Sequence, residues 1–332
     1  MNSKTLRTTL LAAGIALAFG STAVQAEKLV FGVSASQGSL QYRTAEKFAE
    51  VANEKFKQAG LDYNVAFFGD AQLGKDKELM QKLKLGTVAF TQPSSTMPTV
   101  SPEFALWDMP FLVKDRAHLN KIEQEVFWPK IAPTVEDKGY KVISLWENGF
   151  RQMTSNAHPI NSPADLSGIK MRTPNSTWRV SMFREWGGNP TPMAFSEVFV
   201  ALQTGVIDGQ ENPLTNIYAA KLQEVQKYLS LTNHVYTPSY LVAGKRTWDK
   251  LPDAVREVIK SSAEEIRPWM YDTSDKEEAE LLDTLKQGGM QVNTADRAAF
   301  VEASKPIYQQ FAAEVPNGEA LLDQALKLAD AS

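Results

Sequence analysis

Residues 28–56 have the sequence KLVFGVSASQGSLQYRTAEKFAEVANEKF, and this stretch decides the fold class. Its beginning, residues 29–33, is a short apolar run of the kind that forms a buried strand. Apolar side chains then recur at helical spacing from residue 42 to residue 56. The stretch therefore predicts one strand, a loop and one helix in succession.

The same order of strand and helix returns further along the chain. Residues 65–68 are strand-like and residues 76–85 helical, with Gly86 at the position where a left-handed helix cap is expected. Residues 141–146 and 169–173 again have strand-like patterns. Because strands and helices alternate at this spacing, the sequence predicts an α/β protein with a parallel or mixed sheet flanked by helices on both faces.

Residues 1–26 predict an export signal. Lys4 and Arg7 form a charged start, residues 10–19 are apolar, and a small-residue cleavage pattern follows. The apolar run is shorter than the roughly 20 residues that cross a bilayer. We therefore expect cleavage after this segment and release of the mature protein into the periplasm.

The mature chain of 306 residues exceeds the usual size of a single hydrophobic core, which predicts two lobes. A helical pattern over residues 251–286 is interrupted at Pro268, where a kink is expected, and such a long element could brace both lobes. The expected division is lobe I at residues 27–148 with a return at about 237–276, and lobe II at residues 149–236 with about 277–332 packing on it and across both lobes.

Composition limits the classes of partner. The formal net charge of −4 becomes −6 without Lys4 and Arg7, and basic blocks are lacking, so nucleic acid and anionic membranes are unsuitable partners. The chain has no cysteine, which removes disulfides, thiolate metal sites and a cysteine nucleophile. The three histidines, His118, His158 and His234, stand alone in unlike contexts, so we expect neither a metal site nor a cofactor.

Sequence motifs of common enzymes are missing. The chain has no P-loop, Gly-rich dinucleotide turn, nucleophile elbow or HExxH motif. A periplasmic hydrolase that uses two carboxylates remains an alternative, although no such pair stands out. A binding lobe that reports to a sensor kinase is another alternative, and we expect a binding protein rather than an enzyme.

Two arginines follow predicted strands: Arg151 ends NGFR at 148–151, and Arg172 precedes Thr173-Pro174. Ligands of α/β lobes bind at the carboxyl ends of strands, where a guanidinium can hold a carboxylate through two parallel hydrogen bonds. Asn212 is kept extended by the proline that follows it, so its amide can reach the same anion. A surface ion pair for each arginine and a helix cap for Asn212 are the alternative interpretations.

Aromatic residues are frequent, and most of them are expected in the core. Phe195 differs because it lies in a loop, between Pro192-Met193-Ala194 and Ser196, without helical periodicity. Binding pockets have mostly apolar walls with a few placed polar groups, so Phe195 is our candidate for such a wall.

Several ordered motifs between about residue 28 and residue 313 resemble one family, the periplasmic substrate-binding subunits of tripartite ATP-independent (TRAP) transporters of the DctP-like group. The most specific stretches are AQLG at 71–74, NGFR at 148–151, residues 165–174, PMAFSEV at 192–198, ALQTG at 201–205, DGQENP at 208–213, EVQKY at 224–228 and TNH at 232–234.

This resemblance implies a two-lobe binding protein whose sheets exchange strands at the hinge and whose long helix runs behind both lobes. It implies that Arg172 forms the main salt bridge to a ligand carboxylate, with Arg151, Asn212 and Phe195 completing the site. It also implies delivery of a small organic anion to a small and a large integral membrane subunit. We expect the protein to be a monomer.

The substrate is less constrained by the resemblance. Asp76 matches an acid in the site of the similar sialic-acid binders, but Ser94 and Met97 stand where those binders have a further acid and an arginine. Ser34, Gln37 and Ser94 are therefore expected at the far end of a smaller ligand, such as a dicarboxylate, a hydroxy acid or a sugar acid. Sialic acid and a sulfonate, whose oxygens also fit a guanidinium, stay open as alternatives.

Overall fold

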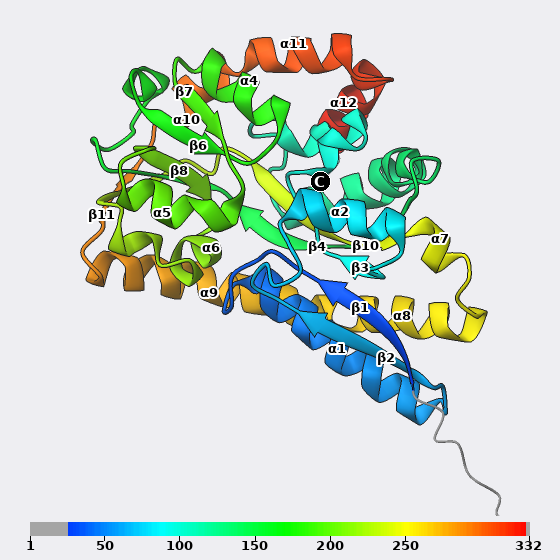
Figure 1. The fold of residues 1–332 in the computed structure, drawn as a ribbon. Coiled ribbons are helices and arrows are strands. Elements are labelled where there is room, and N and C mark those ends of the chain that lie inside the picture. Colours follow the sequence, from blue (N-terminus) through cyan, green and yellow to red (C-terminus); the bar gives the residue numbers. More distant parts are fainter. Residues whose placement is uncertain (1–25, 330–332) are drawn as a thin grey trace, which may run out of the picture.

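The protein is described by a computed structural model of residues 26–329, in which two mixed sheets are flanked by helices (Figure 1). This arrangement confirms the predicted two-lobe α/β fold. The export signal predicted over residues 1–26 lies, apart from Ala26, outside the described residues. Within the part that the structure describes, no helix has both the length and the apolar character needed to span a membrane.

Lobe I is built on a five-stranded sheet with the order β2-β1-β3-β10-β4. β1 runs parallel to β2 and β3, whereas β10 runs antiparallel to β3 and β4. α1 starts where the Ser39 hydroxyl accepts a hydrogen bond from the Tyr42 backbone N–H, and Phe48 from this helix packs edge-on against Phe31 of β1. The bounds are β1 Glu27–Gly32, α1 Leu40–Gln58, β2 Tyr63–Phe68, α2 Asp76–Leu85, β3 Phe90–Thr91, α3 Arg116–Ile122, β4 Tyr140–Phe150, β10 Tyr236–Gly244, α7 Lys245–Trp248 and α8 Asp253–Glu265.

Lobe II is built on a six-stranded sheet with the order β11-β9-β5-β8-β6-β7. β6 runs parallel to β7 and β8, and β5 runs antiparallel to β8 and β9. The bounds are β5 Gln152–Ser155, β6 Lys170–Thr173, α4 Thr177–Glu185, β7 Asn189–Pro192, α5 Val198–Gln203, β8 Gly209–Asn212, α6 Leu214–Ala219, β9 Tyr228–Leu231 and β11 Gln291–Thr294. In the two lobes together, 3₁₀ helices occur at Met97–Thr99, Pro102–Asp108, Ala132–Val135, Pro163–Leu166, Phe195–Glu197 and Leu222–Glu224, and a π-helix at Glu123–Ile131.

The chain crosses between the two sheets at adjacent places. β4 ends at Phe150 in lobe I, and after Arg151 the chain enters β5 of lobe II. β9 ends in lobe II at Leu231, and the chain re-enters lobe I as β10 at Tyr236. The backbone N–H of Arg151 donates to Val235 O at 3.0 Å, so the two crossings lie side by side. They are the strand exchange that the resemblance implied.

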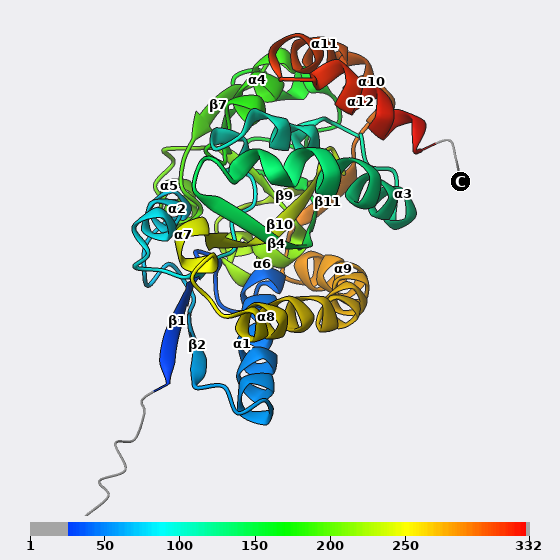
Figure 2. The same cartoon turned by 90° about the vertical axis from the view of Figure 1, so that its right-hand side faces the viewer.

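The helical pattern at residues 251–286 corresponds to two helices, α8 and α9 (Arg267–Gln287), which meet at Ile266. Pro268 lies in the first turn of α9, where a missing N–H breaks no helical hydrogen bond. α9 contacts β4 and α1 of lobe I and α6 of lobe II, and in Figure 1 it runs in orange below α6 and on behind α1 towards α8. Figure 2 shows the last helices, α10 Arg297–Ala303, α11 Lys305–Glu314 and α12 Gly318–Lys327, grouped at the end of the molecule opposite α1.

Gly209 of β8 provides a test of how closely the strands of the lobe II sheet pack around it. A Cβ at this position would lie 2.4 Å from Thr154 O on β5 and 3.1 Å from Met171 Cε on β6. We expect Gly209→Ala to lower the free energy of unfolding by about 1–3 kcal/mol through overpacking. Gly288→Ala, at the end of α9 with its nearest atoms at 3.3 and 3.4 Å, is the control. Equal urea midpoints for the two variants would contradict this packing.

Candidate functional site

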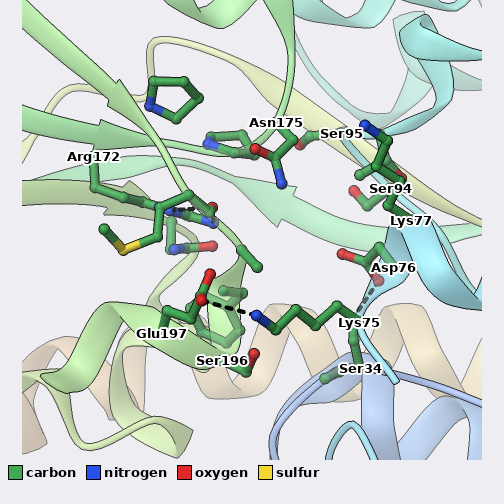
Figure 3. A pocket seen from close by; sticks show the side chains of 18 of the residues that line it. Ser34, Lys75, Asp76, Lys77, Ser94, Ser95, Arg172, Asn175, Ser196 and Glu197 are labelled. Atoms are coloured by element: carbon green, nitrogen blue, oxygen red, sulfur yellow. Dashed lines mark hydrogen bonds and ion pairs between the residues drawn. The ribbon is translucent and has the colours of Figure 1, made fainter. Parts of the chain in front are cut away.

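A cleft of about 1050 Å³ lies between the lobes, with side chains from both lobes on its walls (Figure 3). Lobe I contributes mainly hydroxyl, amide and carboxylate groups, and lobe II contributes the arginines and one aromatic ring. The principal lining residues are Ser34, Gln41, Asp76, Gln92, Ser94 and Ser95 from lobe I, and Arg151, Arg172, Asn175, Phe195, Asn212 and Asn216 from lobe II and the crossing.

Arg172 lies on β6, two residues before Pro174, and its side chain is almost fully buried at 2% exposure. Its Nε and Nη2 donate to Met193 O at 3.0 and 2.7 Å, and the Phe195 ring centre lies 5.8 Å from the guanidinium carbon. Within residues 26–329 it has no carboxylate at salt-bridge distance. Burial lowers the pKa of Arg172 to about 9, so the side chain is still charged at pH 7. The edge formed by Nη1 and Nη2 can therefore bind an anion through two hydrogen bonds.

Arg151 lies at the crossing from β4 to β5 and is held by other residues of the protein. Its Nε and Nη2 donate to the Glu211 carboxylate, with Nη2 to Oε1 at 2.9 Å, and Nη2 also donates to Asn212 Oδ1 at 3.1 Å. Its Nη1 has no hydrogen-bond partner within the described chain. Arg151 thus lines the cleft beside Arg172 but offers less of its guanidinium to a ligand.

Glu211 on β8 is fully buried and joins three basic side chains. Besides Arg151 it accepts from Arg179 Nη1 of α4 at 3.1 Å, and His234 Nε2 lies at 3.1 Å. Burial by itself would raise the pKa of Glu211, but the charges of Arg151 and Arg179 and the hydrogen bond from His234 bring it below its usual range. Arg179 Nε also donates to Asp108 Oδ1 at 2.9 Å. These five side chains form one buried charge network.

The sequence analysis missed Glu211, Arg179 and Asp108. Two of them had a signal: Arg179 lies on the same helix as the core residues Met182 and Phe183, and Glu211 lies directly before Asn212. A charged residue at a position predicted to be buried needs a partner of opposite charge. Their pairing with each other had no signal, because the partners lie 32 residues apart.

The structure places Asn212 beside Arg151 and Phe195 beside Arg172, and all four line the cleft. Asn212 is buried, accepts from Arg151 Nη2 and donates through Nδ2 to Gln210 Oε1 at 2.6 Å. These two hydrogen bonds determine the orientation of the Asn212 amide, with Oδ1 towards Arg151 and Nδ2 towards Gln210. Phe195 is half-buried at the start of a 3₁₀ turn and lines the cleft next to Arg172.

Asp76 and Ser34 lie across the cleft from Arg172 (Figure 3). Asp76 is the first residue of α2, and its carboxylate accepts a hydrogen bond from the Ser34 hydroxyl. Loss of water raises the pKa of Asp76, although the Ser34 hydrogen bond and the charge of Arg172 oppose this rise. Ser94 lines the same wall, where its hydroxyl donates to Pro238 O at 2.7 Å.

Gln37 does not line the cleft, which corrects the sequence-based expectation. The backbone N–H of Ser39 donates to Ser36 O at 3.1 Å, and this tight turn leaves Gln37 exposed at its tip. Gln41, in the first turn of α1, lines the cleft instead. The loop pattern predicted proximity to the site but could not indicate where the chain turns.

A further ion pair joins the two lobes at the cleft, in addition to Arg179 with Asp108. Lys75 Nζ, at the start of α2, lies 2.8 Å from Glu197 Oε1 in the turn before α5 (Figure 3). Both side chains are partly exposed to solvent, so the pair contributes little to stability. In the described part of the chain, no group of three or more His, Asp or Glu side chains could hold a metal ion.

Comparison with known families agrees with this geometry. The DctP family of bacterial extracellular solute-binding proteins, family 7, matches residues 31–314. The chain belongs to this family. It is 34% identical to the 2,3-diketo-L-gulonate-binding periplasmic protein YiaO of Escherichia coli, over 97% of this chain and 98% of that protein.

Solved structures of DctP-family proteins show the same fold. The sugar acid binding protein of Advenella mimigardefordensis, in complex with galactonate, is 32% identical with a TM-score of 0.86, covering 92% of this chain and 99% of that chain. A TRAP periplasmic solute-binding protein of Sulfurospirillum deleyianum with bound succinate is 30% identical with a TM-score of 0.85, covering 91% and 99%. The resemblance to TRAP binding subunits is thereby confirmed.

His234 makes the stability of the protein depend on pH. Burial lowers the pKa of His234 to about 4, whereas a histidine in the unfolded chain has a pKa of about 6.5. Between these values the unfolded state binds more protons, so this contribution to the free energy of unfolding is lost as the pH falls from about 6.5 to about 4. We expect His234→Gln to reduce this slope in urea unfolding measured at several pH values.

The matched control for this prediction is His158→Gln, because His158 is exposed on the surface. The control is expected to leave the slope of the wild-type protein unchanged. A slope that is the same in His234→Gln and in the wild type would show that His234 is not buried in its neutral form.

Proposed function

We propose that this protein captures a small organic acid in the periplasm and hands it to the small and large integral membrane subunits of a TRAP transporter. The observation that supports this proposal most is Arg172, a buried guanidinium that faces the cleft without a carboxylate partner in the described chain. A buried charge is costly unless it is paired, so an anionic ligand is the group that completes this site.

The pairing of the buried charges around the site supports an anionic ligand. Three arginines, Arg151, Arg172 and Arg179, are buried here, whereas the carboxylates that contact them come from Glu211 and Asp108. Burial of His234 favours its neutral form, so it adds no further charge at pH 7. Among the three guanidiniums, Arg172 is the one that no carboxylate of the described chain contacts, because Asp76 lies across the cleft from it. A ligand carboxylate would balance the charge of Arg172 through a bidentate hydrogen bond.

The far end of the cleft favours a hydroxylated monocarboxylate over a dicarboxylate. The family includes proteins whose ligands are 2,3-diketo-L-gulonate, galactonate and succinate. Asp76 here faces the ligand space opposite Arg172, and its carboxylate accepts hydrogen bonds from hydroxyl groups. A second ligand carboxylate would lie against this like charge. We therefore infer that a sugar acid is the ligand, with Arg172 at its acid end and Asp76 at its hydroxyl end.

The remaining parts of this proposal concern the whole chain. Residues 1–26 act as the export signal, and the mature protein works as a monomer. The proposed lobes are residues 27–148 with about 237–276 returning, and residues 149–236 with about 277–332 packing on them and across both lobes. This boundary falls within two residues of the end of β4 at Phe150. A hydrolase that uses two carboxylates is the competing function. Galactonate has no bond for such a hydrolase to cleave, so the test uses a p-nitrophenyl glycoside: a hydrolase would release p-nitrophenol at catalytic rates, and a binding protein would not.

Replacement of Arg172 tests the anion site directly. Arg172→Ala leaves a desolvated ligand carboxylate unpaired, and we expect a loss in affinity for galactonate of about 30-fold to several thousand-fold by calorimetry. Arg172→Lys keeps the charge without the planar fork, and a loss of about tenfold or more is expected. Arg184→Ala, an exposed arginine of α4, is the control. Galactonate binding of normal affinity in Arg172→Ala would place the anion elsewhere.

Replacement of Asp76 tests the hydroxyl end. A hydrogen bond to a charged group contributes about 1.5–3 kcal/mol, so Asp76→Asn is expected to weaken galactonate binding by about 10- to 100-fold. The variant should also lose its discrimination against succinate, because the like charge is removed. Asp70→Asn, on the exposed loop before α2, is the control. Tighter binding of succinate than galactonate by the wild type would overturn the sugar-acid assignment and leave the organic-acid function intact.

A further inference from the structure

A second cavity, of about 490 Å³, lies outside the interlobe cleft. It is formed by the segment before α3 together with α10, α11 and α12, the helices grouped at one end of the molecule in Figure 2. We name it the C-terminal cup and define it by Phe111, Arg297, Val301, Lys305, Tyr308 and Leu326. None of these residues lines the interlobe cleft.

The walls of the C-terminal cup are largely apolar. Val301 and Leu326 are 42% and 41% exposed, which places them among the exposed large apolar side chains of the described chain. They lie in the same cavity as the rings of Phe111 and Tyr308. Exposed apolar side chains gathered around a hollow are typical of a ligand site, whereas scattered single ones are not.

The rim of the C-terminal cup carries an unbalanced positive charge. The Arg297 guanidinium carbon lies 4.6 Å from the centre of the Phe111 ring, and Arg297 has no ion pair within residues 26–329. The neighbouring carboxylate of Asp296 is used as the cap of α10, where it accepts from the N–H groups of Ala298 and Ala299. Lys305 is paired with Glu302. Arg297 is therefore the cation that an incoming anion would meet.

The floor of the C-terminal cup is held in place by hydrogen bonds. Phe111 has a φ of +60°, a conformation that bulky residues rarely adopt. Its backbone N–H donates to His234 O at 2.8 Å, and the Tyr308 hydroxyl donates to Pro110 O at 2.7 Å. These bonds keep the Phe111 ring under Arg297. The cavity is thus formed before any ligand arrives, which lowers the cost of binding.

We propose that the C-terminal cup is a second ligand site, which binds a small aromatic monoanion. The aromatic ring packs on Phe111, Val301 and Leu326, and the carboxylate or sulfonate pairs with Arg297. Ligand sites for small molecules have volumes of about 300–1000 Å³, with apolar walls and few polar groups, and the cup fits this description. The proposal is independent of the organic-acid site, since it uses no residue of the interlobe cleft.

Fluorescence titration of the mature protein with 1-anilinonaphthalene-8-sulfonate, an aromatic monoanion, tests this site. We expect saturable binding of one equivalent. Arg297→Gln is expected to raise the dissociation constant by about two- to fivefold, because it removes an exposed charge and keeps much of the side-chain length. Val301→Asp is expected to abolish binding, because it places a carboxylate in the cup. Arg172→Ala is expected to bind the probe normally, which separates the cup from the interlobe cleft.

Two surface variants outside the C-terminal cup serve as matched controls. Arg246→Gln removes an exposed charge on α7, and Leu85→Asp replaces an exposed apolar residue at the end of α2. Both are expected to bind the probe like the wild type, and circular dichroism verifies folding of all variants. The proposal is overturned by lack of saturable binding, by loss of binding in Arg172→Ala, or by normal binding in both Arg297→Gln and Val301→Asp.

Discussion

The need to balance buried guanidinium charge determines how this site is built. Glu211 lies between Arg151 and Arg179, away from water, and each of its carboxylate oxygens accepts from at least one of them. A carboxylate on β8 can do this because β8 is paired with β5, which follows Arg151, and with β6, which precedes α4. With Glu211 and Asp108 satisfied in this way, Arg172 remains as the buried arginine of the cleft that no carboxylate of the described chain contacts.

The same charge network lies at the place where the chain crosses between the lobes. Arg151 occupies one crossing, and His234 lies in the other, next to β10. Arg179 belongs to lobe II but also donates to Thr237 Oγ1 of β10 at 3.1 Å. Electrostatic partners from both crossings therefore meet at Glu211. Asn212, which lines the cleft, directly follows Glu211 in the sequence. The wall of the cleft is therefore continuous with the contacts that join the two crossings.

In the function that we propose, the two lobes have different parts in ligand recognition. Lobe II supplies the cation and the aromatic wall, which suit the acid group common to organic acids. Lobe I supplies Asp76, Ser34 and Ser94, neutral or acidic groups that distinguish one ligand from another by hydrogen bonding.

Periodicity, proline and glycine are local signals, and they were enough to predict the α/β class, the helix break near Pro268 and the strand ends that bring Arg151, Arg172 and Asn212 to one site. The motifs added the family. The partners of these residues were decided by the tertiary structure alone: Glu211 occupies much of Arg151, Met193 O accepts from Arg172, and Gln37 turns away. The physical reason is that charge pairing and burial depend on distances through space between segments 21 to 71 residues apart, which no local pattern encodes.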